Sequence, residues 1–287
     1  MSTKYPEIPD PGEHDPHTSA TLEHIAFYKF VSTGFPDKIA GALWRETAGL
    51  TGHILLAAEG INGVLAGPTN ALDRFEVALT AGDNFARLFS DFSFKHSSCV
   101  TPPFARLKIH VKDEIVALGI KNIGATRQAG IDDSPREWRE LIRQDDLVII
   151  DNRNSFEVRL GRFKLAIDPA VDNFRDFSGF IFTNLPKWKK NGRRLGMYCT
   201  GGVQCQKSSA WMRDFDIPVY QLEGGILNYF PAMPGPVRDW ECQCFVFDNR
   251  IALDTRLQET NTTATAVYTE PEELWRLECA LRLGNTD

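Results

Sequence analysis

The chain has 287 residues, of which 43% are hydrophobic and 24% charged, and its formal net charge is −6 at pH 7. This composition is that of an ordinary globular protein and excludes global disorder, collagen and coiled coil. No apolar run approaches the roughly 18 residues needed to span a bilayer, and the polar segment 1–15 is unlike a secretory signal. We therefore expect a cytoplasmic protein of two domains that makes no membrane contact.

Cysteine content and charge narrow the functional classes further. Six cysteines in a chain of this length are too few for a disulfide scaffold. The acidic net charge argues against tight, non-specific binding of nucleic acid. Any RNA contact would therefore need a local basic patch.

The first expected domain covers residues 21–122 and follows a Pro- and His-rich segment, 1–20, that we interpret as a flexible tail. Hydrophobic patterning predicts helices over 36–50 and 70–80 and strands over 25–31, 53–58, 64–66, 105–111 and 114–118. The pair Asn62-Gly63 is typical of a hairpin turn. The order β-α-β-β-α-β predicts a ferredoxin-like α+β sandwich.

The second expected domain covers residues 123–236 and alternates strands with helices. Fully apolar runs predict buried strands over 147–150, 195–198 and 219–222, with helices that begin near Ser134 and cover 207–215. This alternation predicts an α/β domain with a parallel sheet. Residues 237–258 are expected to form a terminal hairpin that packs on the core, and 259–287 a tail with a helix over 270–282.

The segment with the clearest chemical signal is the loop that follows the apolar strand 195–198. Cys199 ends this strand, and the loop and the start of the next helix supply Thr200, Gly201, Gly202, Val203, Gln204 and Cys205. Adjacent glycines let backbone amides converge on an anion, and a helix N-terminus adds positive potential. Such a loop lowers the pKa of a thiol and stabilises a thiolate or persulfide. Alternatively, Cys199 is a buried strand-end residue, and Cys205 either resolves a disulfide or packs the helix start.

Four further residues are candidates for supporting roles. Asp151 and Arg153 follow a buried strand, so they either line the mouth of the Cys199 site or form an internal ion pair. Lys207 either helps to hold an anion or is solvated. A turn accounts for the glycines and the asparagine of segment 59–63 but gives no reason for a glutamate there. We therefore regard Glu59 as a candidate residue of the substrate site.

A basic segment is the candidate for RNA contact. Five basic residues lie within eight positions, with Trp188 among them: Lys187, Lys189, Lys190, Arg193 and Arg194. Such a segment binds phosphates while the indole stacks on a base, or it forms a solvated turn.

The sequence shows no evident metal or cofactor motif. All six histidines lie at or before His110, and neither a two-His, one-carboxylate pattern nor a Rossmann glycine pattern is present. The pair Cys242 and Cys244 is too small a ligand set for structural zinc. A Cys–His dyad within the second domain is excluded because that domain has no histidine.

The loop and several separate strings resemble a known family. Asp151-Asn152-Arg153 together with the Cys199 loop resembles a rhodanese domain. The strings at 55–63, 103–104, 112–116, 198–202 and 244–248 are similar to signatures of the tRNA uridine hydroxylase family. The resemblance implies an acylphosphatase-like domain joined to a rhodanese domain, with tRNA as partner and molecular oxygen as co-substrate. It also implies hydroxylation at carbon 5 of the wobble uridine, and it assigns the family's persulfide-type cysteine to Cys199.

The chain departs from the family pattern at two loop positions and near its end. Gln204 and Gln206 stand where the family usually has Arg and Glu, and the usual cysteine-rich C-terminal segment is absent. Losing the Arg removes a fixed positive charge from beside the sulfur. Two alternatives therefore stay open: a thiosulfate-type sulfurtransferase that carries a Cys199 persulfide, and a non-catalytic RNA- or protein-binding paralogue.

Overall fold

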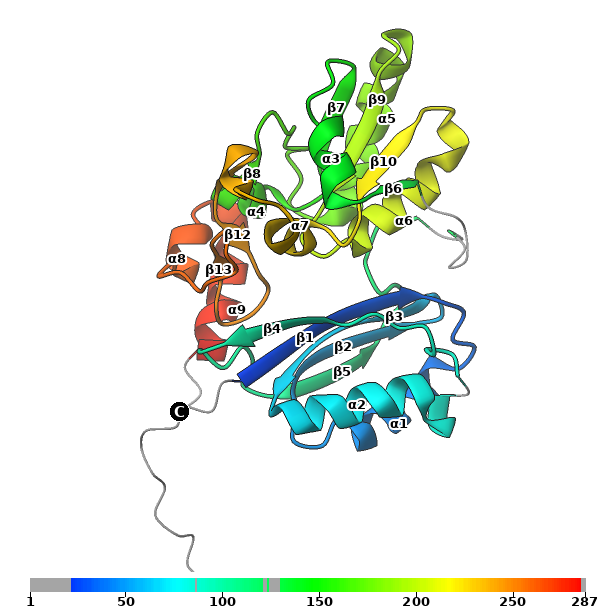
Figure 1. Ribbon diagram of the computed structural model, residues 1–287, viewed down its shortest axis with the longest axis vertical. Helices are drawn as coiled ribbons and strands as arrows, with labels where there is room; N and C mark the ends of the chain where they lie inside the picture. The colour runs from blue at the N-terminus through cyan, green and yellow to red at the C-terminus, as the bar shows by residue number, and fades with distance from the viewer. Residues whose placement is uncertain (1–21, 86, 121–122, 124–129, 285–287) are drawn as a thin grey trace, which may run out of the picture.

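The computed structural model describes residues 22–85, 87–120, 123 and 130–284. The expected tail at 1–20 lies outside these residues. Figure 1 shows an N-terminal domain below, an α/β domain above it, and a C-terminal segment beside both. In the part of the chain that is described, no helix is long and apolar enough to cross a membrane.

The N-terminal domain is a five-stranded sheet whose one face is covered by two helices (Figure 1). The strands lie in the order β4-β1-β3-β2-β5. Their bounds are Leu22–Phe30 (β1), Thr51–Ala57 (β2), Gly60–Gly67 (β3), Lys95–Cys99 (β4) and Leu107–Val111 (β5). The helices are Pro36–Glu46 (α1) and Thr69–Ala81 (α2), followed by a 3-10 turn at Asp83–Phe85. The expected ferredoxin-like sandwich is confirmed in its β4-β1-β3-β2 core.

The hairpin turn between β2 and β3 is not where the sequence predicted it. Ala57 pairs with Gly60, so the turn residues are Ala58 and Glu59, and Asn62 and Gly63 lie within β3. Gly63 serves packing instead, because a Cβ at this position would lie 2.6 Å from the ring of Phe27. The Asn-Gly pair is therefore misleading here, because the close approach of the Phe27 ring from β1 also selects glycine at position 63.

Strand β4 was missed, and the expected strand 105–111 has a different place in the sheet. The sequence of β4 is polar and lacks the apolar alternation that marks a half-buried strand. It pairs antiparallel with β1 at the sheet edge, whereas β5 adds a parallel strand beside β2. The expected strand at 114–118 is wrong, because this segment has no regular structure and leads toward the second domain.

The alternation of β1 determines which side chains face the second domain. Ile25 and Phe27 belong to the core beneath the helices. Successive side chains of a strand point to opposite faces, so Tyr28 faces away from the helices. Lys95 of β4 pairs with Ala26 of β1, which places Lys95 on the same face as Tyr28. This face is turned toward the α/β domain (Figure 1).

The second domain has a four-stranded parallel sheet in the order β6-β10-β9-β7, which confirms the predicted architecture. The strands are Ile131–Asp133 (β6), Leu147–Asp151 (β7), Arg194–Tyr198 (β9) and Val219–Leu222 (β10). The helices are Pro135–Leu141 (α3), Ser155–Leu160 (α4), Phe177–Lys190 (α5), Val203–Met212 (α6) and Ile226–Ala232 (α7), with 3-10 turns at Phe174–Asp176, Arg213–Phe215 and Pro236–Arg238. Helix α6 begins at Val203 rather than at Lys207, directly behind the glycines, so its N-terminus belongs to the Cys199 loop.

The C-terminal segment connects the two domains. Trp240–Cys242 (β11) pairs with Gly161–Phe163 (β8), and Cys244–Phe245 (β12) pairs antiparallel with Ala252–Leu253 (β13). The chain continues through Ala264–Val267 (α8) and a 3-10 turn at Pro271–Glu273 to Leu274–Gly284 (α9). Glu259 accepts a hydrogen bond from the amide of Val100 at 2.7 Å, and the amide of Asn249 donates to the carbonyl of Pro103 at 3.0 Å. These contacts tie the segment to the N-terminal domain.

A capping box fixes the start of α3, as the sequence predicts. The Ser134 hydroxyl accepts from the amide of Glu137, and the Glu137 carboxylate accepts from the amide of Ser134. We expect Ser134→Ala to lower the free energy of unfolding by about 1 kcal/mol because an orphan amide loses its acceptor. Ser134→Asp keeps an acceptor and should be near wild type. Urea denaturation monitored by circular dichroism measures both, and equal stability of Ser134→Ala and wild type would contradict the cap.

Candidate active site

Cys199 follows the carboxyl end of β9 and is almost fully buried. Its Sγ accepts a hydrogen bond from the amide of Gly202 at 3.1 Å. Gly202 has a φ of 101°, in the left-handed region that favours glycine, and it turns the chain into α6. The sulfur therefore sits against the N-terminal end of a helix.

Hydrogen bonds to the sulfur outweigh its burial. Burial raises the pKa of the Cys199 thiol, but the thiol of Cys205 and the amides of Cys205, Gly202 and Gln204 donate to the sulfur, and the net result is a pKa lowered to about 6. The thiolate form is therefore favoured at neutral pH. Burial raises the pKa of Cys205, whose proton is further held by its hydrogen bond to Cys199. Cys205 is a free thiol and donates a hydrogen bond to the Cys199 sulfur.

A second loop, between β10 and α7, holds the Cys199 loop in place. The amide of Ile226 donates to the carbonyl of Cys199 at 3.0 Å, and the amide of Leu227 to that of Thr200 at 3.2 Å. Gly225 has a φ of 69°, and a Cβ there would lie 2.5 Å from the Cys199 carbonyl oxygen. This close approach requires glycine.

The N-terminal domain contributes two residues that the sequence analysis missed. Lys95 Nζ donates to the carbonyl oxygens of Gly201 and Gly224, each at 2.6 Å. The Tyr28 hydroxyl lies against Gly202, so close that a Cβ at position 202 would be 2.9 Å from the hydroxyl oxygen. Burial lowers the pKa of Lys95 to about 8, against the opposing effect of the Cys199 thiolate. The role of Lys95 could have been inferred from the sequence only if β4 had been recognised as a strand, because its alternation places Lys95 on the sheet face away from the helices.

Glu59 and Lys207 meet across the domain interface. Lys207 Nζ lies 2.7 Å from Glu59 Oε1, 2.6 Å from Glu114 Oε2 and 2.9 Å from the carbonyl oxygen of Val116. An ammonium has three N–H donors, and these contacts use all of them. Lys207 is buried and serves to join the two domains, so the geometry gives it no donor for an anion at the Cys199 loop. Glu59 belongs to the same ion cluster.

Asp151 and Arg153 form the internal ion pair that was one of the two expectations. Arg153 Nε and Nη2 donate to the two carboxylate oxygens of Asp151 at 2.8 and 2.6 Å, and Nη2 also donates to the carbonyl of Gly161. Both side chains are fully buried, and the guanidinium lies 5.3 Å from the ring centre of Trp240. The pair fixes the loop that follows β7.

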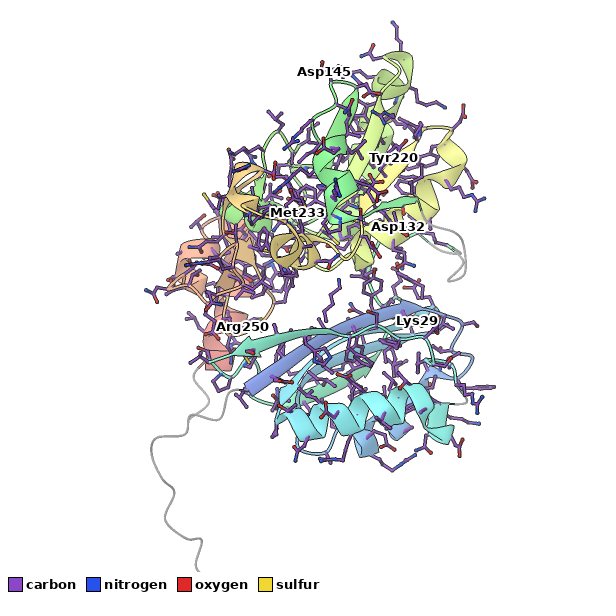
Figure 2. The ribbon with its side chains drawn as sticks, viewed as in Figure 1. Lys29, Asp132, Asp145, Tyr220, Met233 and Arg250 are labelled. Atoms are coloured by element: carbon purple, nitrogen blue, oxygen red, sulfur yellow. The ribbon has the colours of Figure 1, made fainter. Side chains whose placement is uncertain are left out.

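The basic segment lies at the opposite end of the sheet from Cys199. Its residues precede or begin β9, whereas Cys199 follows that strand, so the two ends are roughly 15 Å apart. Arg194 makes a bidentate ion pair with Asp146, and Arg193 donates to the carbonyl of Asp145, which Figure 2 shows far from the N-terminal domain. Trp188 is buried in the core, so the expectation that its indole stacks on a base is wrong. Asp132, by contrast, lies at the end that faces the N-terminal domain (Figure 2).

The remaining loop residues supply backbone rather than charge. No cationic side chain occurs between Cys199 and Gln206. The amide of Gln204 donates to the sulfur, and its side chain is half-buried. Within the described ranges, no group of three or more His, Cys, Asp or Glu side chains is arranged to hold a metal ion.

Comparisons with known proteins find relatives of the N-terminal domain and of most of the chain. Residues 22–115 match the family described as UPF0176 acylphosphatase like domain. A Synechococcus elongatus protein named tRNA uridine(34) hydroxylase is 43% identical over 83% of this chain and 87% of its own. A Nitrobacter winogradskyi protein of the same name is 42% identical over 88% of this chain and 99% of its own. A rhodanese-related protein from Thermoplasma volcanium, 18% identical, covers 36% of this chain and 95% of its own with a TM-score of 0.27.

The fold and the site define a protein in which an acylphosphatase-like domain covers the cysteine loop of an α/β domain with a parallel sheet. With relatives at this identity over most of its length, the chain belongs to the tRNA uridine(34) hydroxylase family. The resemblance drawn from the sequence strings is thereby confirmed.

The hydrogen bonds to Cys199 predict an acidic thiol. Thiolate absorbance at 240 nm, taken as the difference between wild type and Cys199→Ala across a pH titration, should show a midpoint near pH 6. Cys205→Ala removes one donor to the sulfur and should move the midpoint upward by about one pH unit. Cys279→Ala, at an exposed cysteine, is the control and should leave it unchanged. A wild-type midpoint above pH 8 would contradict the account of the loop.

The ion cluster at the interface predicts a large loss of stability on substitution. Lys207→Met leaves two carboxylates facing each other without their cation and should lower the free energy of unfolding by about 3–5 kcal/mol. Lys38→Met, on the exposed side of α1, removes the same charge and should change it by less than about 0.5 kcal/mol. Guanidinium denaturation of both variants makes the comparison. Similar stabilities would show that the cluster does not hold the domains together.

Proposed function

We propose that this protein hydroxylates carbon 5 of the wobble uridine of tRNA, with molecular oxygen as oxidant and Cys199 as the essential sulfur. The observation that carries the proposal is the Cys199 loop: a buried sulfur with a pKa lowered to about 6, in a chain of the tRNA uridine(34) hydroxylase family. The relatives' name supplies the substrate and the reaction. The loop supplies the reactive group.

The proposed reaction balances with a thiol as reductant. Hydroxylation replaces the C5–H bond of uracil with C5–OH, so one atom of O2 enters the uridine and the other leaves as water. Forming that water takes two electrons and two protons. We assign these to two molecules of a small thiol, which are oxidised to one disulfide.

Cys199 acts as a nucleophile in this scheme. Its thiolate adds to C6 of uracil, breaks the C5=C6 double bond and leaves the electron pair on C5 as an enolate. C5 then bonds to O2 and gives a hydroperoxide after protonation, and the two thiols reduce the O–O bond and release water. Loss of the C5 proton and expulsion of the Cys199 thiolate restore the double bond.

The geometry requires the base to be presented alone. Cys199 is 1% exposed, and Lys95 and Tyr28 lie over its loop. The uridine must therefore leave its stack in the anticodon loop to reach the sulfur. The basic segment 187–194 is too far from Cys199 to position that base, so we do not assign the anticodon to it.

The test is complementation of a bacterial strain that lacks its own tRNA uridine hydroxylase, followed by mass spectrometry of tRNA nucleosides. Wild type should restore 5-hydroxyuridine, and Cys199→Ser should reduce it at least about a hundredfold because a hydroxyl is a far weaker nucleophile than a thiolate at neutral pH. Cys279→Ser is the matched control at an exposed cysteine and should restore it fully.

Other outcomes point to the alternatives. If wild type restores no 5-hydroxyuridine but transfers sulfur from thiosulfate to cyanide, and Cys199→Ser abolishes that transfer, the protein is a sulfurtransferase with a Cys199 persulfide. If wild type shows neither activity, the non-catalytic interpretation stands and the proposal is refuted. Hydroxylation that survives Cys199→Ser would refute the role of Cys199.

A further inference from the structure

One peptide unit connects Lys95 to the reactive sulfur. The carbonyl of Gly201 and the amide of Gly202 belong to the same peptide plane. The carbonyl accepts from Lys95 Nζ at 2.6 Å, and the amide donates to Cys199 Sγ at 3.1 Å. In a trans peptide these two groups point in opposite directions, so the ammonium and the sulfur lie at opposite edges of this peptide unit.

This arrangement makes the two hydrogen bonds support each other. A cation at the carbonyl draws electron density toward oxygen and leaves the amide hydrogen more positive, and chains of hydrogen bonds strengthen in this way in a low-dielectric interior. The site meets that condition, because Lys95 and Cys199 are both largely removed from water. Charge-assisted hydrogen bonds are also about twice as strong as neutral ones.

Lys95 also joins the two loops of the site. Its second hydrogen bond goes to the carbonyl of Gly224, in the loop that holds the Cys199 carbonyl through Ile226. Both loops consist largely of glycine near these contacts, so their backbones have little intrinsic stiffness. The ammonium fixes the direction of the Gly201 carbonyl and thereby the direction of the Gly202 amide.

We propose that Lys95, from the N-terminal domain, is a positioning residue that orients and polarises the Gly201–Gly202 peptide so that its amide stabilises negative charge on the Cys199 sulfur. The loop has Gln204 where the family usually has an arginine, and Lys95 of the N-terminal domain supplies a cation in its place. Docking of the domains and activation of the thiol are one event. The inference uses the proposed function only in taking Cys199 as the reacting sulfur.

Several other titratable groups act on the sulfur or on Lys95 from neighbouring elements, and each is unchanged in the test below. They are Cys205 on α6, Tyr28 on β1, Glu157 on α4, Cys244 on β12 and Glu223 after β10. Tyr28 remains neutral across the range of the titration because burial raises its pKa. Burial raises the pKa of Glu157 to about 7, so this carboxyl titrates within that range in every variant. Comparison between variants therefore isolates the contribution of Lys95.

The experiment is the thiolate titration of the full chain at 240 nm, with each variant measured against the same variant carrying Cys199→Ala. Lys95→Met should raise the Cys199 midpoint by at least about one pH unit, a tenfold shift of the thiol–thiolate equilibrium. Lys95→Arg keeps a cationic donor and should stay within about half of that shift. Lys38→Met loses an equal charge from the far side of the N-terminal sheet and should leave the midpoint at its wild-type value.

A second neutral variant guards against misfolding. Lys95→Gln keeps hydrogen-bond donors on a polar side chain, and it should fold and raise the midpoint in the same direction as Lys95→Met. A wild-type midpoint in folded Lys95→Gln or Lys95→Met would overturn the inference. The titration needs no tRNA, so a failure of the proposed hydroxylation leaves this result intact, and an unchanged midpoint in a variant that still hydroxylates would refute only the role of Lys95.

Discussion

Negative charge on a buried sulfur is the constraint that organises this molecule. Cys199 has almost no contact with water, and burial alone favours its neutral form. The charge is stabilised instead by the amides at the start of α6 and by the thiol of Cys205. The glycines of both loops, the neutral partner cysteine and the early start of α6 all follow from this requirement.

The site is built from two domains, because one provides Cys199 and the other provides Lys95, whose ammonium donates to the carbonyl oxygens of Gly201 and Gly224. The ion cluster around Lys207 holds them in register, since its ammonium lies between two carboxylates of the N-terminal domain. Tyr28 and Lys95 then meet the Cys199 loop from a single face of the sheet. Glu59 and Lys207, which the sequence suggests as site residues, therefore serve the docking of the two domains.

Sequence reasoning succeeded where a pattern is local. The strands that end at Asp151 and Tyr198 carry apolar runs over 147–150 and 195–198, which are typical of buried parallel strands, and the Cys199 loop is recognisable from its glycines. It failed where tertiary contacts decide. Strand β4 is polar because it lies at an edge and faces the other domain, so neither the strand nor the role of Lys95 was visible. Trp188 lies in a charged segment yet is buried, because helical periodicity turns it inward.

The most direct test of the account is the S–H stretching band in infrared difference spectra of wild type and Cys199→Ala at pH 7. The account places the proton on Cys205 and the charge on Cys199. Replacing Cys199 should therefore remove no S–H band and should shift the Cys205 band to higher frequency, since Cys205 loses its thiolate acceptor. Disappearance of one S–H band, with the Cys205 band unmoved, would show that Cys199 is protonated and would contradict this assignment.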